Sequence, residues 1–283
     1  MISEEIRFMS MKMKRILMFA IFFAAGAGAL FAGNNIKFQQ YIPASEVYGV
    51  NIDVNSEEIE VALWNRNEFR VTVVSSTNSY PVFELSDGIL SSKGTGSMCK
   101  IEIKVPESFY ARSAYGGWTI STTSGSIRAS KLWGDSIDIE TTSGSIGLTK
   151  CEAQLAYVSS ISGAVSFSKC IFSNLLNVDA KSGNIRFDGI AAGINAETSS
   201  GSITASFDQP FTQDCNFDTS SGAVNISLPE NPGFKFVFDT SSGSVYNAFT
   251  GYSGGRSGID VYGYGYVVCR VDTGSGSIRI LRK

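Results

Sequence analysis

The stretch Ile139–Leu148 reads IETTSGSIGL and contains a short phrase, close to Thr-x-Ser-Gly-Ser-Ile, that decides the fold. The phrase recurs eight times between residues 118 and 283, with a regular spacing that lengthens only before the last copy. Its glycines are Gly125, Gly144, Gly163, Gly183, Gly201, Gly222, Gly243 and Gly276. A period of about 20 residues in a strand-rich chain is typical of a stacked repeat architecture.

The residues on both sides of each glycine alternate with the period of a β-strand. Five and seven positions before the glycine the residue is apolar, and two positions after it the residue is Ile or Val in every copy. The apolar parity changes across the glycine, as it does where a bend contains an extra residue whose backbone glycine tolerates. We therefore predict an all-β, parallel β-solenoid of about eight coils of roughly 20 residues. A globular sandwich with coincidental repeats is the alternative.

The two ends of the repeat region differ from its middle. Residues 33–113 lack the phrase, and their short alternating segments (47–54, 59–63, 69–74, 82–85 and 101–105) predict a small antiparallel β cap. The solenoid itself is expected over residues 114–283. A Gly- and Tyr-rich insertion at 250–268 breaks the period and is predicted to protrude as a loop or hairpin. The last repeat is then expected to end the stack without a cap.

The N-terminus has the features of a signal peptide over residues 1–32. Basic residues (Lys12, Lys14 and Arg15) precede the apolar segment 16–23, and small residues follow, with cleavage expected after Ala29 or Ala32. A permanent membrane anchor is the alternative. No other segment is long and apolar enough to span a membrane, so the mature chain is expected in the periplasm, on the outer surface or in the medium.

Composition argues against most enzyme classes. The chain has no histidine, which removes His-based triads and most zinc sites. The serines of the phrase occur in eight equivalent copies, which indicates a structural role, so we expect no catalytic residues and no cofactor apart from the Ca²⁺ considered below. Without residues 1–32 the net charge is −5, and no basic residues cluster in the sequence, so nucleic acid is not an expected partner.

A column of acidic residues is the first candidate site. Four positions before the glycine lie Asp179, Glu197, Asp218, Asp239 and Asp272, which stacking would place one strand spacing apart. Such a ladder of hard oxygen ligands could bind Ca²⁺ or a basic partner. The alternative is a solvated face that keeps the protein soluble, its repulsion eased by raised pKa values and by nearby Arg186 or Arg279.

Four of the five cysteines fall into register with the repeat. Cys151 and Cys170 both lie seven residues after their glycines, which places them one coil apart and within reach of a disulfide. Two buried thiols are the alternative. Cys215 and Cys269 share a core column, but Phe236 is expected between them, at a separation of roughly 10 Å that excludes a bond.

The tyrosines of the insertion are the last candidate contacts. Tyr252, Tyr262, Tyr264 and Tyr266 could stack on sugar rings or pack against the last coil. The threonines three positions before each glycine share the parity of the core residues and are expected to be buried at the corner.

These features together resemble a known family. An N-terminal signal, a β-rich lead-in, the phrase Ile101–Pro106 (IEIKVP) and serial Thr-Ser-Gly-Ser-Ile units are similar to the bacterial "putative adhesin" domains of unknown function, which form β-solenoids. The resemblance covers residues 34–283. It implies an extracytoplasmic, surface-type role without a defined ligand, and it supplies no catalytic or binding residues.

Three functions are compatible with the sequence. The favoured one is a secreted or cell-envelope, non-catalytic, adhesin-like protein that presents a rigid repeat surface to a protein or glycan. A structural periplasmic or envelope protein that self-associates is the second, because open solenoid ends can pair. A polysaccharide-active enzyme is the most remote, because such enzymes need clustered acids in a cleft built by long loops.

Overall fold

The computed structural model describes residues 35–230 and 232–283, so the predicted signal peptide lies outside the described residues. Strands provide nearly all of the regular structure, alongside two short 3-10 helices, Ala44–Glu46 and Ser113–Tyr115, and the all-β prediction is confirmed. Within this part of the chain, no helix has the length and apolar character needed to cross a membrane.

The strands run in chain order as β1 (Asn35–Pro43), β2 (Gly49–Val54), β3 (Glu58–Trp64), β4 (Glu68–Ser75), β5 (Val82–Ser86), β6 (Ile89–Lys93), β7 (Cys99–Pro106), β8 (Trp118–Thr122), β9 (Ile127–Ser130), β10 (Trp133–Thr141), β11 (Ile146–Thr149), β12 (Glu152–Ser160), β13 (Val165–Ala180), β14 (Ile185–Thr198), β15 (Ile203–Phe207), β16 (Cys215–Thr219), β17 (Val224–Leu228), β18 (Phe234–Thr240), β19 (Val245–Asn247), β20 (Tyr252–Ser253), β21 (Ser257–Tyr262), β22 (Val268–Thr273) and β23 (Ile278–Arg282).

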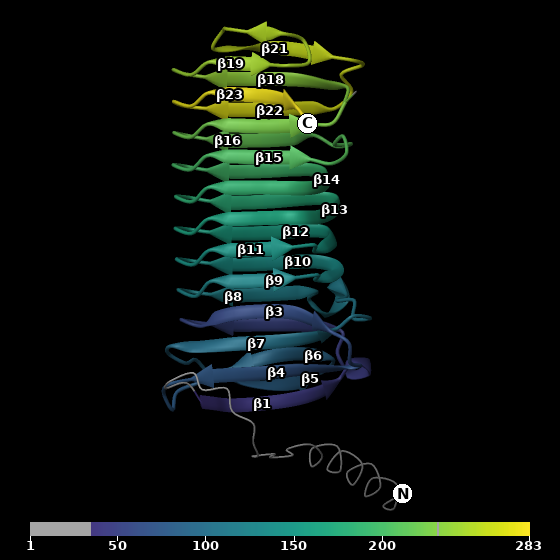
Figure 1. Cartoon of the computed structure of the whole chain (residues 1–283), viewed down its shortest axis with the longest axis vertical. Helices are drawn as coiled ribbons and strands as arrows, with labels where there is room; N and C mark the ends of the chain where they lie inside the picture. The colour runs from purple at the N-terminus through teal and green to yellow at the C-terminus, as the bar shows by residue number, and fades with distance from the viewer. Residues whose placement is uncertain (1–34, 231) are drawn as a thin grey trace, which may run out of the picture. The chain divides into compact units, whose positions relative to one another are not determined.

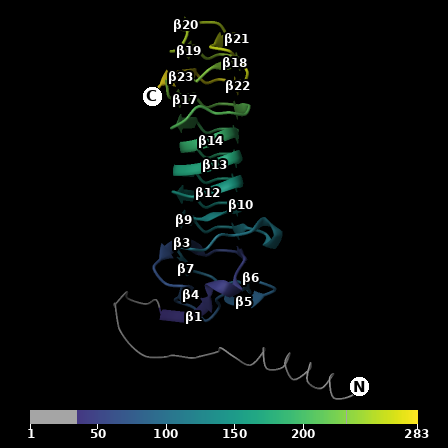
Figure 2. The same cartoon turned by 90° about the vertical axis from the view of Figure 1, so that its right-hand side faces the viewer.

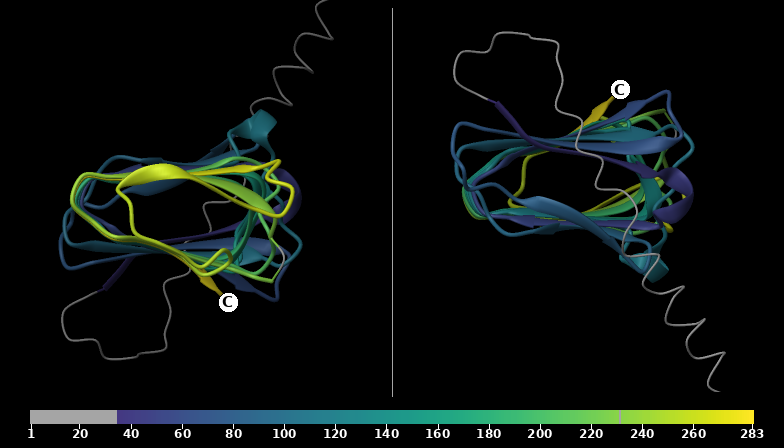
Figure 3. Two further views of the ribbon diagram at one scale, coloured as in Figure 1. Left: turned by 90° about the horizontal axis from the view of Figure 1, so that it is seen from above. Right: turned by 90° about the horizontal axis from the view of Figure 1, so that it is seen from below.

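Residues 35–283 form two mostly parallel strand stacks that face each other across a narrow core (Figure 1; Figure 3). The strand segments that precede a Ser-Gly corner make up sheet A, and those that follow it make up sheet B; the long strands β13 and β14 begin in sheet B and end in sheet A. The side view shows successive strands stacked along one axis (Figure 2). Like pairs with like, as when Ile139 lies beside both Ile120 and Val158. The parallel solenoid predicted from the repeat is therefore what the pairing produces.

Glycine is required at the corners by close approach of the backbone. A Cβ atom on Gly163 would lie 1.8 Å from the carbonyl oxygen of Gly144, and one on Gly144 would lie 1.8 Å from that of Gly125. None of the eight repeat glycines has a positive φ. Glycine was predicted at these corners because of an unusual bend conformation, and that reason was wrong. Glycine is needed there because the layers stack too closely for a side chain.

The hydroxyl column confirms the prediction of buried corner threonines. Thr198 Oγ1 accepts a hydrogen bond from the Gly201 amide at 3.1 Å and donates to the Gly183 carbonyl of the preceding layer at 3.0 Å. The same two hydrogen bonds, one within the layer and one to the adjacent layer, are made by the hydroxyls of Thr141, Ser160, Thr219, Thr240 and Thr273. Each hydroxyl thus satisfies two backbone groups that the tight corner would otherwise leave buried.

The C-terminal repeat is not the end of the stack. Strand β22 pairs in parallel with β16 on one side and with β18 on the other, and β23 lies likewise between β17 and β19. The chain therefore skips one layer after β17, builds β18 and β19, and returns to fill the gap (Figure 1). The expectation that the last repeat terminates the stack was wrong.

The insertion closes the end that the last repeat was expected to leave open. Strand β21 pairs antiparallel with β18, and β20 pairs antiparallel with β19. Antiparallel strands can follow a hairpin turn directly, which lets the chain reverse at the end of the stack. The segment 250–268 is therefore largely an end cap rather than a protruding hairpin.

At the N-terminal end, too, the chain skips a layer, returns to fill it and closes the stack with antiparallel strands. Strands β2 and β3 pair in parallel with β8 and β9, and also with β6 and β7, although β4 and β5 intervene in the sequence. Beyond them, β4, β5 and β1 pair antiparallel and close the end. The antiparallel cap is thus smaller than predicted, because β2, β3, β6 and β7 continue the parallel stack without the Ser-Gly phrase. Strands β1 and β6 were not anticipated.

Candidate functional site

The acidic column forms on the outer surface of sheet A. Asp179 pairs with Glu197, Glu197 with Asp218, and Asp218 with Asp272 rather than with Asp239. Asp239 follows as the outermost acid because the last two repeats exchange places. In the described part of the chain, no three acidic or cysteine side chains converge closely enough to hold a metal ion. Calcium binding by the column therefore stays a prediction.

At one position of the acidic column, Asp272, the pKa is raised as the predicted repulsion between carboxylates requires. Burial and the neighbouring carboxylates of Asp218 and Asp239 raise the pKa of Asp272, while the guanidinium of Arg270 opposes the shift. Arg186 and Arg279 lie on β14 and β23 in sheet B, so they do not flank the column. The expectation that they ease its repulsion was wrong, and Arg270 is the adjacent cation.

Cys151 and Cys170 lie in adjacent layers, as predicted. The amide of Ile171 donates to the Cys151 carbonyl at 2.9 Å, which fixes the two cysteines one layer apart. Both are buried free thiols in the structure. A hydrogen bond with Cys170 and burial raise the pKa of the Cys151 thiol well above its ordinary value. The disulfide between them stays a prediction.

Cys215 and Cys269 are direct neighbours, which contradicts the prediction that a layer containing Phe236 separates them. Cys215 on β16 is the register partner of Cys269 on β22, and Phe236 lies on the far side of Cys269. Burial raises the pKa of Cys215 to about 12 and that of Cys269 well above its usual value. This error and the unexpected order of Asp272 and Asp239 have one origin, because the C-terminal repeat fills the layer before β18.

The four tyrosines of the insertion divide into two pairs. Tyr252 packs against Phe238 with ring centroids 5.2 Å apart, and Tyr262 packs against Phe249 at 5.0 Å. Tyr264 and Tyr266 instead are 86% and 85% exposed. Their rings are nearly parallel, at 14° and 5.8 Å between centroids. Tyr252 and Tyr262 are thus half-buried against the core, whereas Tyr264 and Tyr266 are exposed; ligand contact by the four tyrosines stays a prediction.

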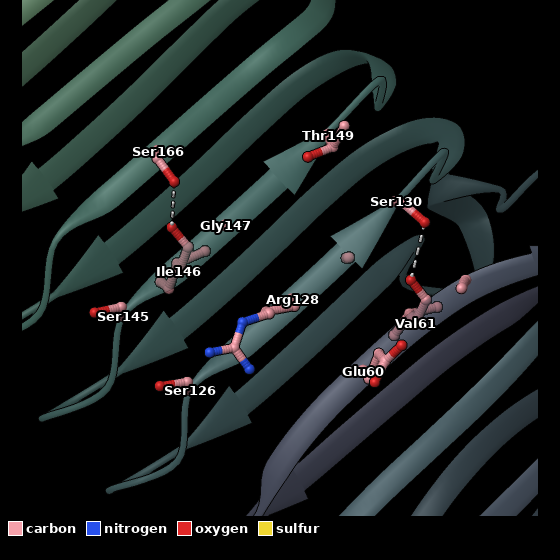
Figure 4. Close-up of a pocket in the computed structure, with 12 residues that line it drawn as sticks. Glu60, Val61, Ser126, Arg128, Ser130, Ser145, Ile146, Gly147, Thr149 and Ser166 are labelled. Atoms are coloured by element: carbon pink, nitrogen blue, oxygen red, sulfur yellow. Dashed lines mark hydrogen bonds between the residues drawn. The ribbon is translucent and has the colours of Figure 1, made fainter.

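A shallow depression of about 440 Å³ lies on sheet B, near the N-terminal third of the stack (Figure 4). Small residues of β9, β11 and β13 and of the corners before β9 and β11 line it, together with two charged side chains from β3 and β9: Ser126, Ser130, Ser145, Gly147, Thr149, Ser166, Glu60 and Arg128. Ser166 Oγ donates to the Ile146 carbonyl at 3.3 Å and Ser130 Oγ to the Val61 carbonyl at 3.5 Å. The depression is open and hydroxyl-rich, and sequence reasoning did not identify it.

Three lysines at the second corner of the coil were also missed. Lys131, Lys150 and Lys169 occupy equivalent positions in three successive layers and are all exposed. The amide of Lys131 donates to the Thr149 carbonyl and that of Lys150 to the Ser168 carbonyl, at 2.9 and 2.8 Å. These lysines could have been found from the sequence, because they are spaced by the same interval as the nearest glycines. Basic residues do not cluster along the linear sequence, but these three lie next to one another in the fold.

Comparison with solved structures gives remote similarities. The chain is similar to a "putative adhesin" from Bacteroides fragilis (14% identity; 86% of this chain and 96% of that one; TM-score 0.49). It is also similar to a "putative adhesin" from Parabacteroides distasonis (13% identity; 86% and 96%; TM-score 0.37). A third is a "putative cell adhesion protein" from Clostridium sporogenes (12% identity; 88% and 100%; TM-score 0.29). No curated protein matches the chain.

The sequence model of one family covers almost all of the described residues. The Toastrack DUF4097 model matches residues 31–281, which include both capped ends and all eight Ser-Gly corners. The resemblance inferred from the signal, the lead-in and the repeated phrase is thereby confirmed. The chain belongs to the Toastrack DUF4097 family.

Proposed function

We propose that the protein is an extracytoplasmic, non-catalytic binding protein of the adhesin type, which presents a rigid repeat surface to a glycan or protein ligand. The observation that carries this proposal is the exposed pair Tyr264 and Tyr266, held nearly parallel at the C-terminal end of the stack. Large aromatic side chains that remain exposed together are typical of binding surfaces, because they offer contact area with little loss of conformational freedom.

The architecture supports the same function. The hydroxyl column bonds layer to layer at every corner of the repeat except the one at Ala180, and the core of interlocked aromatic and β-branched residues is continuous from β1 to β23. Binding groups placed on such a scaffold are held in fixed relative positions, which reduces the entropy lost when a ligand docks. The predicted signal peptide is consistent with export, and cell fractionation with an antibody against the chain would test that location.

Binding of the purified protein to an array of glycans and surface proteins tests the proposal. We expect the wild type to bind at least one class of ligand and the double variant Y264A/Y266A to bind it about tenfold more weakly. A matched control, Y41A/Y157A, removes two exposed tyrosines from β1 and β12, away from the C-terminal end of the stack, and should retain binding. Absence of any binding by the wild type, or turnover of an arrayed polysaccharide, contradicts the proposal.

Self-association is the second candidate function, and one observation favours it. On β21, Ile259 and Val261 are 62% and 52% exposed. Strand β21 pairs with β18 on one side only among the described residues. Exposed apolar edge strands can pair with another chain. Sedimentation velocity would decide: reversible dimers that are lost in I259K/V261K support this function, and a monomer at every concentration rejects it.

A further inference from the structure

The lysine ladder, Lys131, Lys150 and Lys169, is a row of positive charges that runs along the stacking axis. Neighbouring members are one layer apart, a spacing of about 5 Å. None of them takes part in an ion pair with any residue of 35–230 or 232–283. Like charges at this spacing repel one another, so the ladder is electrostatically unfavourable for the free protein.

The backbone conformation of the ladder makes lysine an unfavourable choice for a second reason. Lys131, Lys150 and Lys169 have φ values of 56°, 54° and 54°, in the left-handed region. This region costs about 1–2 kcal/mol for most L-residues, and glycine or asparagine adopts it more readily. The corner therefore requires the left-handed conformation, but it does not require lysine. Folding alone does not account for three lysines at this corner.

The residues next to the ladder are small and rich in hydroxyl groups. Ser130 and Thr149 directly precede Lys131 and Lys150, and both line the depression on sheet B (Figure 4). At the centre of this surface, Gly147 is not sterically required, because a Cβ atom there would meet only Ser166 Oγ, at 3.6 Å. Glycine inside a strand is unfavourable by about 0.5–1 kcal/mol relative to alanine, and it often marks a place where another molecule approaches closely.

The exposed ring of Trp133 lies beyond the ladder, two residues after Lys131. An indole can stack on the apolar face of a sugar ring while its edge stays in water. The surface thus combines a straight row of cations, a hydroxyl-lined depression and an aromatic ring. The one acidic side chain that lines the depression, Glu60, is paired with Lys100 at 2.7 Å. The acidic column lies on the opposite sheet, so an anionic ligand is repelled there and attracted here.

We propose that the lysine ladder and the adjoining depression bind a linear acidic polysaccharide, laid along the stacking axis. The carboxylates of its uronic-acid units would contact the ammonium groups, and its hydroxyls would exchange hydrogen bonds with the serine and threonine side chains. A single-stranded nucleic acid fits less well, because its binding relies on a series of aromatic platforms. Of the two described aromatic residues within two positions of a ladder lysine, Phe167 is buried and only Trp133 is exposed. This inference rests on the proposed binding function and names a ligand class and a second surface for it.

The experiment measures binding of the intact mature protein to alginate, a linear polyuronate, with neutral dextran as the control polymer. We expect the protein to bind alginate, and we expect the affinity to fall as the salt concentration is raised, because salt screens exposed charges. The variant K131N/K150N/K169N should lose about tenfold or more in affinity while melting no lower than the wild type, since asparagine suits the left-handed conformation. A matched control, K181N/R256N/R279N, makes the same change of net charge at exposed residues away from the depression and should retain binding.

A second variant tests the same surface without changing the ladder lysines, so its result does not depend on how their replacement affects folding. Replacing Gly147 with leucine fills the depression without removing any charge, and it should also weaken alginate binding. Equal binding of dextran and alginate, or unchanged affinity in the ladder variant, would overturn the inference. Stronger competition by single-stranded DNA than by alginate would replace it with a nucleic-acid site. If the wild type ignores alginate but binds another arrayed ligand, only this inference fails; if it binds nothing, the proposed function fails with it.

Discussion

Thr240 Oγ1 donates a hydrogen bond to the carbonyl oxygen of Gly276, 36 residues later in the chain, at 3.0 Å. In five other repeats the equivalent hydroxyl donates to the glycine carbonyl of an earlier repeat, as Thr219 does to Gly201 at 2.9 Å. The reversed direction at Thr240 identifies the layer formed by β22 and β23 as an interior one. Both ends of the stack are thus closed by antiparallel strands after the chain has skipped a layer and returned to fill it.

The glycine column gives a sharp contrast between two similar substitutions. Gly163→Ala places a Cβ atom 1.8 Å from the Gly144 carbonyl oxygen, so the layers must separate. We expect a loss of about 3 kcal/mol or more in the free energy of unfolding. Gly147→Ala meets no such obstacle and should be neutral or stabilise by about 0.5 kcal/mol. Urea denaturation of the two variants measures both, and equal stabilities would refute close approach as the reason for glycine.

The hydroxyl column is interrupted at Ala180, three residues before Gly183. Thr198→Ala should cost about 1–3 kcal/mol, because it removes the partner of the Gly201 amide and of the Gly183 carbonyl. Ala180→Thr should instead stabilise by up to about 1 kcal/mol by completing the column. Thermal and urea unfolding check both changes. If Thr198→Ala is as stable as the wild type, the two bonds contribute nothing and the account of the corner is wrong.

The acidic column predicts a pH-dependent effect at Asp272. Because its folded-state pKa is raised, the native state holds this proton more tightly than the unfolded chain, and stability falls as pH rises through that pKa. Asp272→Asn should therefore stabilise the protein at neutral pH, by about 0.5 kcal/mol. The difference from the wild type should vanish at a pH below the ordinary pKa of aspartate. A gain that persists unchanged in acid would show that charge is not its cause.

The repeat made most of the fold predictable. Each copy specifies its own strand pair and corner, so Ile127, Ile146 and Ile278 could be assigned to buried positions without any long-range information. The corner threonines followed from parity alone. The N-terminal strands β1 and β6 were missed because they lie outside the repeat, where short alternating segments compete with turns.

The order of the layers could not be read from the repeats themselves. Phe236 and Cys269 occupy the same position of the phrase, so either repeat could follow the one that contains Cys215. What distinguishes them is the pair of antiparallel strands β20 and β21, which pair with β19 and β18 and can close the stack only if those two strands are outermost. The long interval between Gly243 and Gly276 predicts an inserted loop from the sequence, whereas in the structure it also contains this closing segment.

The lysine ladder was missed for a different reason. Alignment on the glycine was used to compare apolar, acidic and cysteine positions, whereas the basic residues Lys131, Lys150 and Lys169, six residues after their glycines, were judged only from the linear sequence. Their left-handed backbone could not be inferred, because lysine is not typical of that conformation. The depression around Gly147 likewise depends on three layers coming together, which no single repeat contains.

The order of the layers sets every surface column described above, and the pair Cys215 and Cys269 tests it most directly. The two cysteines are register partners on β16 and β22, within the range that a disulfide spans, whereas sequential stacking would hold them roughly 10 Å apart. Unfolded, reduced protein should be refolded in a glutathione redox buffer, digested and mapped by mass spectrometry. We predict a peptide cross-linked through Cys215 and Cys269. Correctly refolded protein in which these two cysteines never join, while Phe236→Cys joins Cys215, would contradict the layer order.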